Sequence, residues 1–119
     1  MAPLETAIDE LRQLLSADCT APEWRWKVRR RLSKVKDALA GAEARQADAW
    51  LAARAQSSNR VRHQLQARTA TLASGVLEKL DTDSIVHELR RLVTDLDHHV
   101  QRVHDLVYDS VSLELGGSE

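Results

Sequence analysis

A line of apolar residues with heptad spacing in the last third of the chain constrains the fold more than any other feature. It consists of Ile85, Leu89, Leu92, Leu96, His99, Val103, Leu106, Ser110 and Leu113. A second line runs beside it through Val86, Val93, Val100 and Val107. Side chains three and four positions apart share one face of an α-helix, so this pattern predicts a long helix over residues 84–115 with a broad apolar face. A face of that width can pack against two neighbouring helices rather than one.

Three earlier segments have helical spacing too, the third of them through Val61, Leu65, Leu72, Val76 and Leu80, and nothing in the sequence indicates strands. Leu4, Ile8, Leu11 and Leu15 repeat at intervals of four and three, and a similar pattern follows over residues 28–53. Both prolines precede residue 23, and the sequence lacks runs of β-branched and aromatic residues with alternating polarity. We therefore predict an all-α fold in one domain, residues 1–119: an antiparallel helical bundle of three to four helices with a long C-terminal helix. The expected helices are residues 3–16, 21–56, 59–80 and 84–115.

Three short polar segments predict where these helices begin and end. Residues 20–23 read T-A-P-E, a capping box in which the side chains of Thr20 and Glu23 each accept from the other's backbone amide. Residues 56–59, Gln-Ser-Ser-Asn, favour a turn over a stutter in one continuous helix. Residues 81–84 contain an aspartate suited to capping the last helix, and Gly116 with Gly117 ends it.

The predicted helices differ in length, which leads us to expect self-association. The last helix should span about 48 Å, whereas the first, of about 14 residues, covers less than half of it. We expect a homodimer to bury the remaining apolar surface, because two-fold self-association is the commonest soluble assembly. Candidate contacts with a second copy, or with another protein, are Trp24, Trp50, His99 and Tyr108. At its apolar seam position, His99 can set the register of a dimer, serve as an ordinary buried histidine or bind a ligand.

Residues 24–36 concentrate positive charge. They carry seven cations and no acid: Arg25, Lys27, Arg29, Arg30, Arg31, Lys34 and Lys36. We favour a solvated helix face that pairs with carboxylates of its neighbours, such as Glu10 on the first helix and Asp95 and Asp97 on the last. The alternatives are nucleic-acid binding, with Trp26 stacking on bases, and attachment to a membrane surface. Neither is the partner we expect, because the net charge of the whole chain is −1.

The last predicted helix also contains four of the five histidines. Asp95, His98, His99 and His104 form a candidate metal site, because carboxylate and histidine at positions i and i+3 are ligands in helical metal bundles. The signal is weak, since no second helix carries such a pair. A metal or small ligand in the bundle near these residues is therefore an alternative prediction, and we expect no cofactor.

The remaining features exclude several classes of protein. The sequence has no glycine-rich phosphate loop and no nucleophile elbow, so it indicates no enzyme. Cys19 is the one cysteine, and neither a signal peptide nor an apolar run of about 18 residues is visible. We expect a cytoplasmic protein, and abundant Ala and Arg with few Lys suggest a bacterial source. The function we predict is a non-enzymatic, coiled-coil-like protein–protein interaction module that self-associates.

Overall fold

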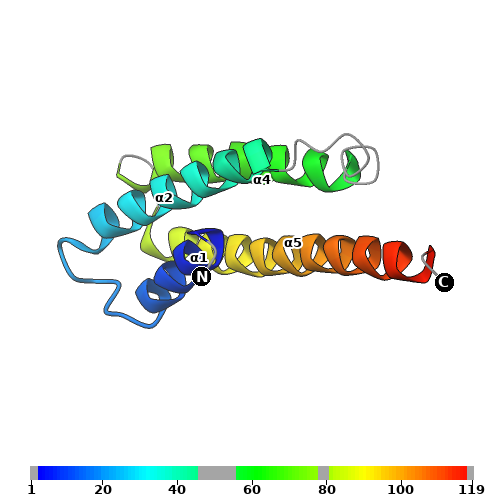
Figure 1. Cartoon of the computed structure of the whole chain (residues 1–119). Coiled ribbons are helices and arrows are strands. Elements are labelled where there is room, and N and C mark those ends of the chain that lie inside the picture. Colours follow the sequence, from blue (N-terminus) through cyan, green and yellow to red (C-terminus); the bar gives the residue numbers. More distant parts are fainter. Residues whose placement is uncertain (1–2, 46–55, 78–80, 118–119) are drawn as a thin grey trace.

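Four helices make up the part of the chain that the structure describes. The computed structural model describes residues 3–45, 56–77 and 81–117, and the side chains of residues 3–41, 59–77 and 81–105. The helices are α1 (Pro3–Leu15), α2 (Trp24–Arg45), α4 (Gln56–Val76) and α5 (Thr82–Gly117). No strand occurs within these residues (Figure 1). The predicted all-α helical bundle is confirmed.

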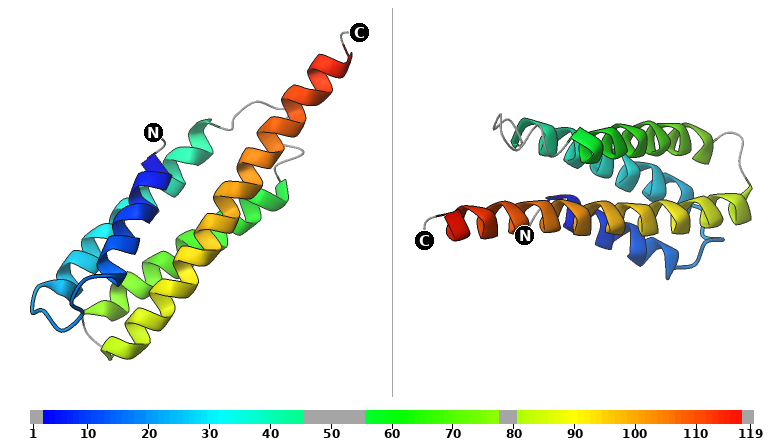
Figure 2. Two further views of the ribbon diagram at one scale, coloured as in Figure 1. Left: turned by 90° about the horizontal axis from the view of Figure 1, so that it is seen from below. Right: turned by 90° about the vertical axis from the view of Figure 1, so that its right-hand side faces the viewer.

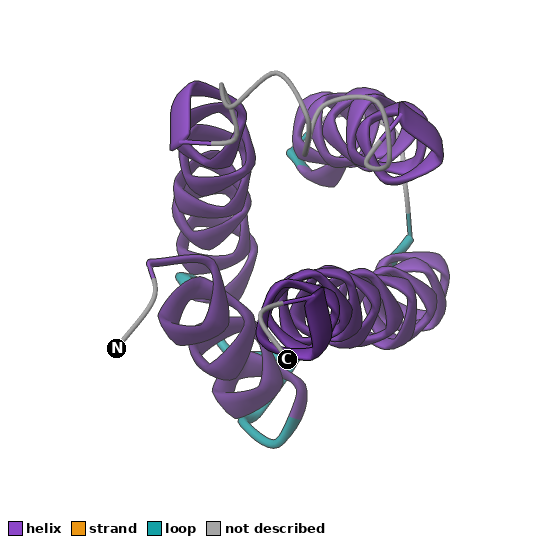
Figure 3. Cartoon of the chain, turned by 45° about the vertical axis from the view of Figure 1, so that its right-hand side comes forward, coloured by secondary structure: helices purple, strands orange, loops and turns teal. Residues whose placement is uncertain are grey.

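The helices are arranged in two layers of two. Figure 1 shows α2 and α4 side by side above α1 and α5. Each helix packs against two others, which are α1 with α2, α2 with α4, α4 with α5, and α5 with α1. Figure 2 shows that neighbouring helices run in opposite directions, and Figure 3 shows them around one common axis. As a result, α2 and α5 lie diagonally opposite each other.

Polar contacts between the helices define their registers. Within the upper layer, the Arg25 guanidinium donates to the carbonyl of Val76 at 2.9 Å, and that of Arg62 donates to the carbonyl of Leu39 at 3.3 Å. Both contacts fit one antiparallel register of α2 and α4, which brings Arg45 opposite Gln56. The two contacts show that α2 and α4 pair along the stretch from Arg25 to Leu39 on α2 and from Arg62 to Val76 on α4.

In the lower layer, α5 is longer than the helices beside it. His104 Nε2 lies 3.0 Å from Oε1 of Glu5, and Arg12 pairs with Asp97, so that the start of α1 lies opposite position 106. Arg68 pairs with Asp95 at 2.6 Å, which brings the start of α4 opposite position 107. Residues 108–117 of α5 thus continue about 15 Å past the described ends of both neighbours (Figures 1 and 2).

All four helices contribute to one apolar core. On α5, the predicted positions Ile85, Leu89, Leu92 and Leu96 are buried. The largest buried side chain is Trp24 at the start of α2, which is 2% exposed. Its indole Nε1 donates to the carbonyl of Leu14 at 2.9 Å, which also accepts from the Ala17 amide at 3.2 Å, and this bond joins the end of α1 to the start of α2.

Two predicted helix boundaries are wrong. The Thr20 hydroxyl donates to the carboxylate of Asp18 at 2.6 Å, and α2 begins at Trp24, so residues 20–23 form no capping box. Residues 56–59 are the first turn of α4 rather than a turn between helices, because Ser and Asn are tolerated at the start of a helix as well as in loops. Residues 46–55 lie outside the described residues.

The predicted cap of the last helix is correct. The amide of Ser84 donates to Oδ1 of Asp81 at 3.0 Å, and the amide of Ile85 donates to the Asp81 carbonyl. Hydrogen bonds from the Ser84 side chain and from its amide lower the pKa of the Asp81 carboxyl. Because Asp81 accepts at this point, α5 begins at Thr82, two residues before its predicted start.

Candidate functional site

A buried polar pair interrupts the apolar core between α4 and α5. Arg62 is 2% exposed and His99 is 3% exposed. Arg62 donates to the Leu39 carbonyl of α2 and, at 3.4 Å, to Oδ1 of Asn59. Burial lowers the pKa of His99, and the positive charges of Arg62 and Arg102 lower it further. His99 is therefore a neutral side chain inside its own chain, and the prediction that it contacts a partner is wrong.

The candidate metal ligands do not converge. Asp95 pairs with Arg68 of α4, His104 lies beside Glu5 of α1, and His99 faces the core. His98 is exposed. Among the described residues, no three His, Cys, Asp or Glu side chains are grouped as metal ligands would be. The predicted metal site is wrong because four residues that are near in sequence lie on different faces of α5.

The predicted partner-contact tryptophans have separate outcomes. Trp24 is a core residue, so its prediction as a contact surface is wrong. Trp50 and the side chain of Tyr108 lie outside the described residues, and Tyr108 belongs to the part of α5 that extends past α1 and α4. None of the described helices has the length and apolarity needed to span a bilayer.

Asp95 and Asp97 of α5 do not pair with the basic stretch of α2. Asp95 pairs with Arg68 of α4, and Asp97 pairs with Arg12 of α1, because these are the helices beside α5. The predicted pairing of these two carboxylates with α2 is therefore wrong. The predicted pairing of Glu10 is correct, since its carboxylate lies 3.3 Å from Arg31 and 3.6 Å from Lys34.

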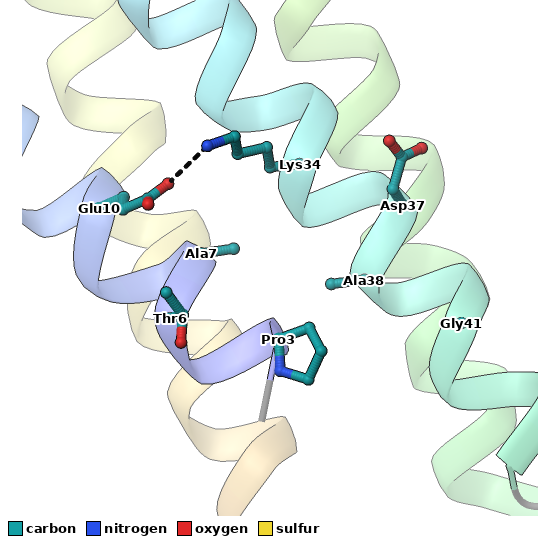
Figure 4. Close-up of a pocket in the computed structure, with 8 residues that line it drawn as sticks. All are labelled: Pro3, Thr6, Ala7, Glu10, Lys34, Asp37, Ala38 and Gly41. Atoms are coloured by element: carbon teal, nitrogen blue, oxygen red, sulfur yellow. Dashed lines mark ion pairs between the residues drawn. The ribbon is translucent and has the colours of Figure 1, made fainter. Parts of the chain in front are cut away.

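Figure 4 shows the groove between α1 and α2 where Glu10 meets Lys34. The small side chains of Ala7 and Ala38 line the groove and let the two helices lie close together, and Gly41 lies at its open end. The two ionic side chains at its edge are already paired with each other. This groove therefore serves helix packing.

The layered arrangement separates the charges of the chain. The sequences of α2 and α4 contain eleven Lys and Arg residues and two acids, a net charge of +9. The sequences of α1 and α5 contain four Arg residues and ten acids, a net charge of −6. The upper layer in Figure 1 is strongly basic and the lower layer is acidic, although the whole chain has a net charge of only −1.

The solvent side of α2 carries cations around an exposed tryptophan. We call this surface the basic face, and it consists of Trp26, Lys27, Arg29, Arg30 and Lys36, all of which are exposed. In the described part of the chain these four cations form no ion pair. Trp26 is 53% exposed, and the Arg30 guanidinium lies over its ring, 4.7 Å from the centroid. The basic face thus combines charge with an accessible aromatic ring.

Sequence reasoning missed Arg62 as a core residue, although a signal for it was present. The buried residues of α4 are Arg62, Leu65, Thr69, Leu72 and Val76, spaced three and four apart. The line counted back from Val76 at this spacing passes through two polar residues. A search for apolar residues alone follows Val61 instead, which is only partly buried.

Comparisons with protein-family models, with curated proteins and with solved structures found no match to this chain.

Proposed function

We propose that this chain is a non-enzymatic helical interaction module that self-associates through the projecting end of α5, residues 108–117. The observation that supports the proposal is the register of the bundle. Both helices that flank α5 begin opposite positions 106 and 107, while α5 continues to Gly117. An isolated helical segment of ten residues is marginal in water, so a partner that packs against it would stabilise it.

A second copy of the chain is the partner we favour. The projecting segment contains four large apolar residues in its sequence, which are Tyr108, Val111, Leu113 and Leu115. Full burial of such a side chain contributes about 1.5–3 kcal/mol, so eight half-buried side chains from two copies contribute roughly 6–12 kcal/mol. Association costs about 4–15 kcal/mol, so at most about 8 kcal/mol remains; a net gain of about 5.5–7 kcal/mol, near that favourable end, gives a weak dimer with a dissociation constant of roughly 10–100 μM.

The charge of the segment predicts how salt affects this association. The segment contains Asp109 and Glu114 and no cation. Two such segments repel each other when they pair, and dissolved salt screens the repulsion between exposed charges. The dimer should therefore become tighter, not weaker, when the ionic strength is raised.

Analytical ultracentrifugation of two truncated chains tests the proposal. The full chain should sediment as a monomer–dimer mixture near 50 μM, and a chain that ends at Val107 should remain a monomer. Circular dichroism per residue should show that the shortened chain keeps its bundle. The matched control ends at Gly117 and retains all of α5, so it should dimerise like the full chain.

A monodisperse full-length monomer at 200 μM in either low or high salt would refute self-association. So would an equal dimer fraction for the full chain and for the chain that ends at Val107, because the contact would then lie elsewhere.

A further inference from the structure

We propose that the basic face of α2 is a binding site for single-stranded nucleic acid, with phosphates on Lys27, Arg29, Arg30 and Lys36 and a base stacked near Trp26. This inference goes beyond the proposed self-association and does not depend on it. The basic face lies on the upper layer, whereas the projecting segment belongs to α5 in the lower layer (Figure 1).

The first argument is that Lys27, Arg29, Arg30 and Lys36 have no carboxylate partner among the described residues. Of the described carboxylates on the helices beside α2, Glu10 alone pairs with this stretch, and α4 contains no acidic residue in its sequence. With a net charge of +9 in its layer, this side of the molecule attracts polyanions even though the chain as a whole has a net charge of −1. A phosphate backbone supplies the repeated negative charges that match this surface.

The second argument is that Lys27 opposes the stability of its own helix. It lies in the first turn of α2, which contains no acid, although the N-terminal end of a helix dipole is positive and disfavours cations. Local rules of stability are most often broken at functional sites, where a ligand compensates the cost. An anion bound across this end of α2 would remove the unfavourable interaction.

The third argument is Trp26, which distinguishes single strands from other polyanions. Its side chain is 53% exposed beside the cations, while Trp24, two residues earlier, fills the core. Arg30 covers one face of the Trp26 ring. Unpaired bases stack on exposed aromatic rings and on Arg guanidinium groups, and they do so with little sequence preference. Neither an acidic peptide nor a paired duplex presents free base surfaces to such a ring.

The packing of α2 argues against two other ligands. Because α1 and α4 flank α2 on both sides, only its solvent side is open to a ligand, and a paired duplex offers no free base surface to Trp26 there. The apolar stripe of α2 formed by Val28, Leu32 and Val35 is fully buried, so it cannot insert into a membrane surface. From Lys27 to Lys36 the face extends for about 14 Å, the length of a few nucleotides.

Fluorescence anisotropy with a labelled twelve-nucleotide oligo(dT) tests the proposal on the full chain. Each phosphate contact to a single strand contributes about −0.7 to the slope of log K against log salt, so four contacts predict a slope near −3 and a loss of about 50-fold between 50 and 200 mM salt. Lys36→Gln should reduce the steepness of this slope by about 0.7. Arg90→Gln is the matched control, because it removes the same charge from an exposed position on α5 and should leave the slope unchanged.

Trp26→Leu tests the stacking contribution. It retains an apolar side chain but lacks the ring, so affinity should fall about tenfold at every salt concentration with the slope preserved. The chain that ends at Val107 should bind the oligonucleotide as tightly as the full chain, which separates this test from that of self-association.

Several results would overturn the proposal. One is the absence of binding at 100 μM protein in 20 mM salt. Another is an equal effect of Lys36→Gln and Arg90→Gln, which would indicate attraction without a site. Equally tight binding of a twelve-base-pair duplex, or of polyglutamate with the same number of charges, would show that the surface recognises anions of a different class.

Discussion

Trp24 and Trp26 provide a direct test of how this bundle is held together. The two tryptophans stand two positions apart near the start of α2, but Trp24 is 2% exposed and Trp26 is 53% exposed. We expect Trp24→Ala to destabilise the fold strongly and Trp26→Ala to have little effect. Both substitutions change helix propensity by the same few tenths of a kcal/mol, so their difference isolates the tertiary contribution of Trp24.

The expected magnitude follows from packing and from one hydrogen bond. Truncation of a buried Trp to Ala costs about 3–5 kcal/mol, because it removes apolar contacts and leaves a cavity. The bond from the Trp24 indole to the Leu14 carbonyl contributes about 1 kcal/mol of that loss. Its contribution stays small, because the same carbonyl also accepts from the Ala17 amide at 3.2 Å and keeps a partner. A chain of 119 residues has a free energy of unfolding of roughly 6–18 kcal/mol, so Trp24→Ala removes a large share of it.

Urea and thermal unfolding followed by circular dichroism measure the difference. At about 4 °C per kcal/mol for a domain of this size, Trp24→Ala should lower Tm by roughly 12–20 °C. Trp26→Ala should change the free energy of unfolding by no more than about 0.5 kcal/mol. Trp24→Phe retains most of the ring area but lacks the indole N–H, so its cost should fall between the two. If Trp24→Ala and Trp26→Ala shift Tm equally, the contact between α1 and α2 described above is incorrect.

Three further substitutions have outcomes that the structure predicts. Because the pKa of His99 is lowered in the folded chain, the unfolded chain takes up a proton first as the pH falls below 6.5, and the free energy of unfolding should decrease by at most about 1.4 kcal/mol per pH unit. The His99→Gln variant should lack this part of the decrease when urea unfolding is measured across pH. The same pH dependence in both proteins would contradict the prediction. Asp81→Ala should speed hydrogen exchange of the Ser84 amide and lower Tm, and unchanged exchange would show that the cap is unimportant. Gly41→Ala should raise the free energy of unfolding by about 0.5–1 kcal/mol, because alanine has the higher helix propensity and an added Cβ meets no atom within 4 Å on the exposed side of α2. A lower Tm for this variant would count against this placement of α2.

Local patterns in the sequence were sufficient to predict the helical class, the broad apolar face of α5 and a capping aspartate within residues 81–84, which the structure identifies as Asp81. Each depends on spacing within a few residues, since a helix brings positions three and four apart onto one face whatever surrounds it. The same spacing separated Trp26 from the apolar stripe of Val28 and Leu32. The boundaries before α2 and α4 were less predictable, because Ser, Thr and Asn are favourable both in turns and in first helical turns.

Only the tertiary structure decided which helices are neighbours, and the distribution of charge followed from that choice. The sequence contains enough acid on α5 to neutralise α2, but the two helices lie diagonally opposite each other, so Asp95 and Asp97 pair with α4 and α1 instead. The burial of Arg62 beside His99 likewise depends on which residues meet across the bundle. The reason is physical: periodicity along one helix determines which face is apolar, whereas the partner of that face is selected by packing among all four helices at once.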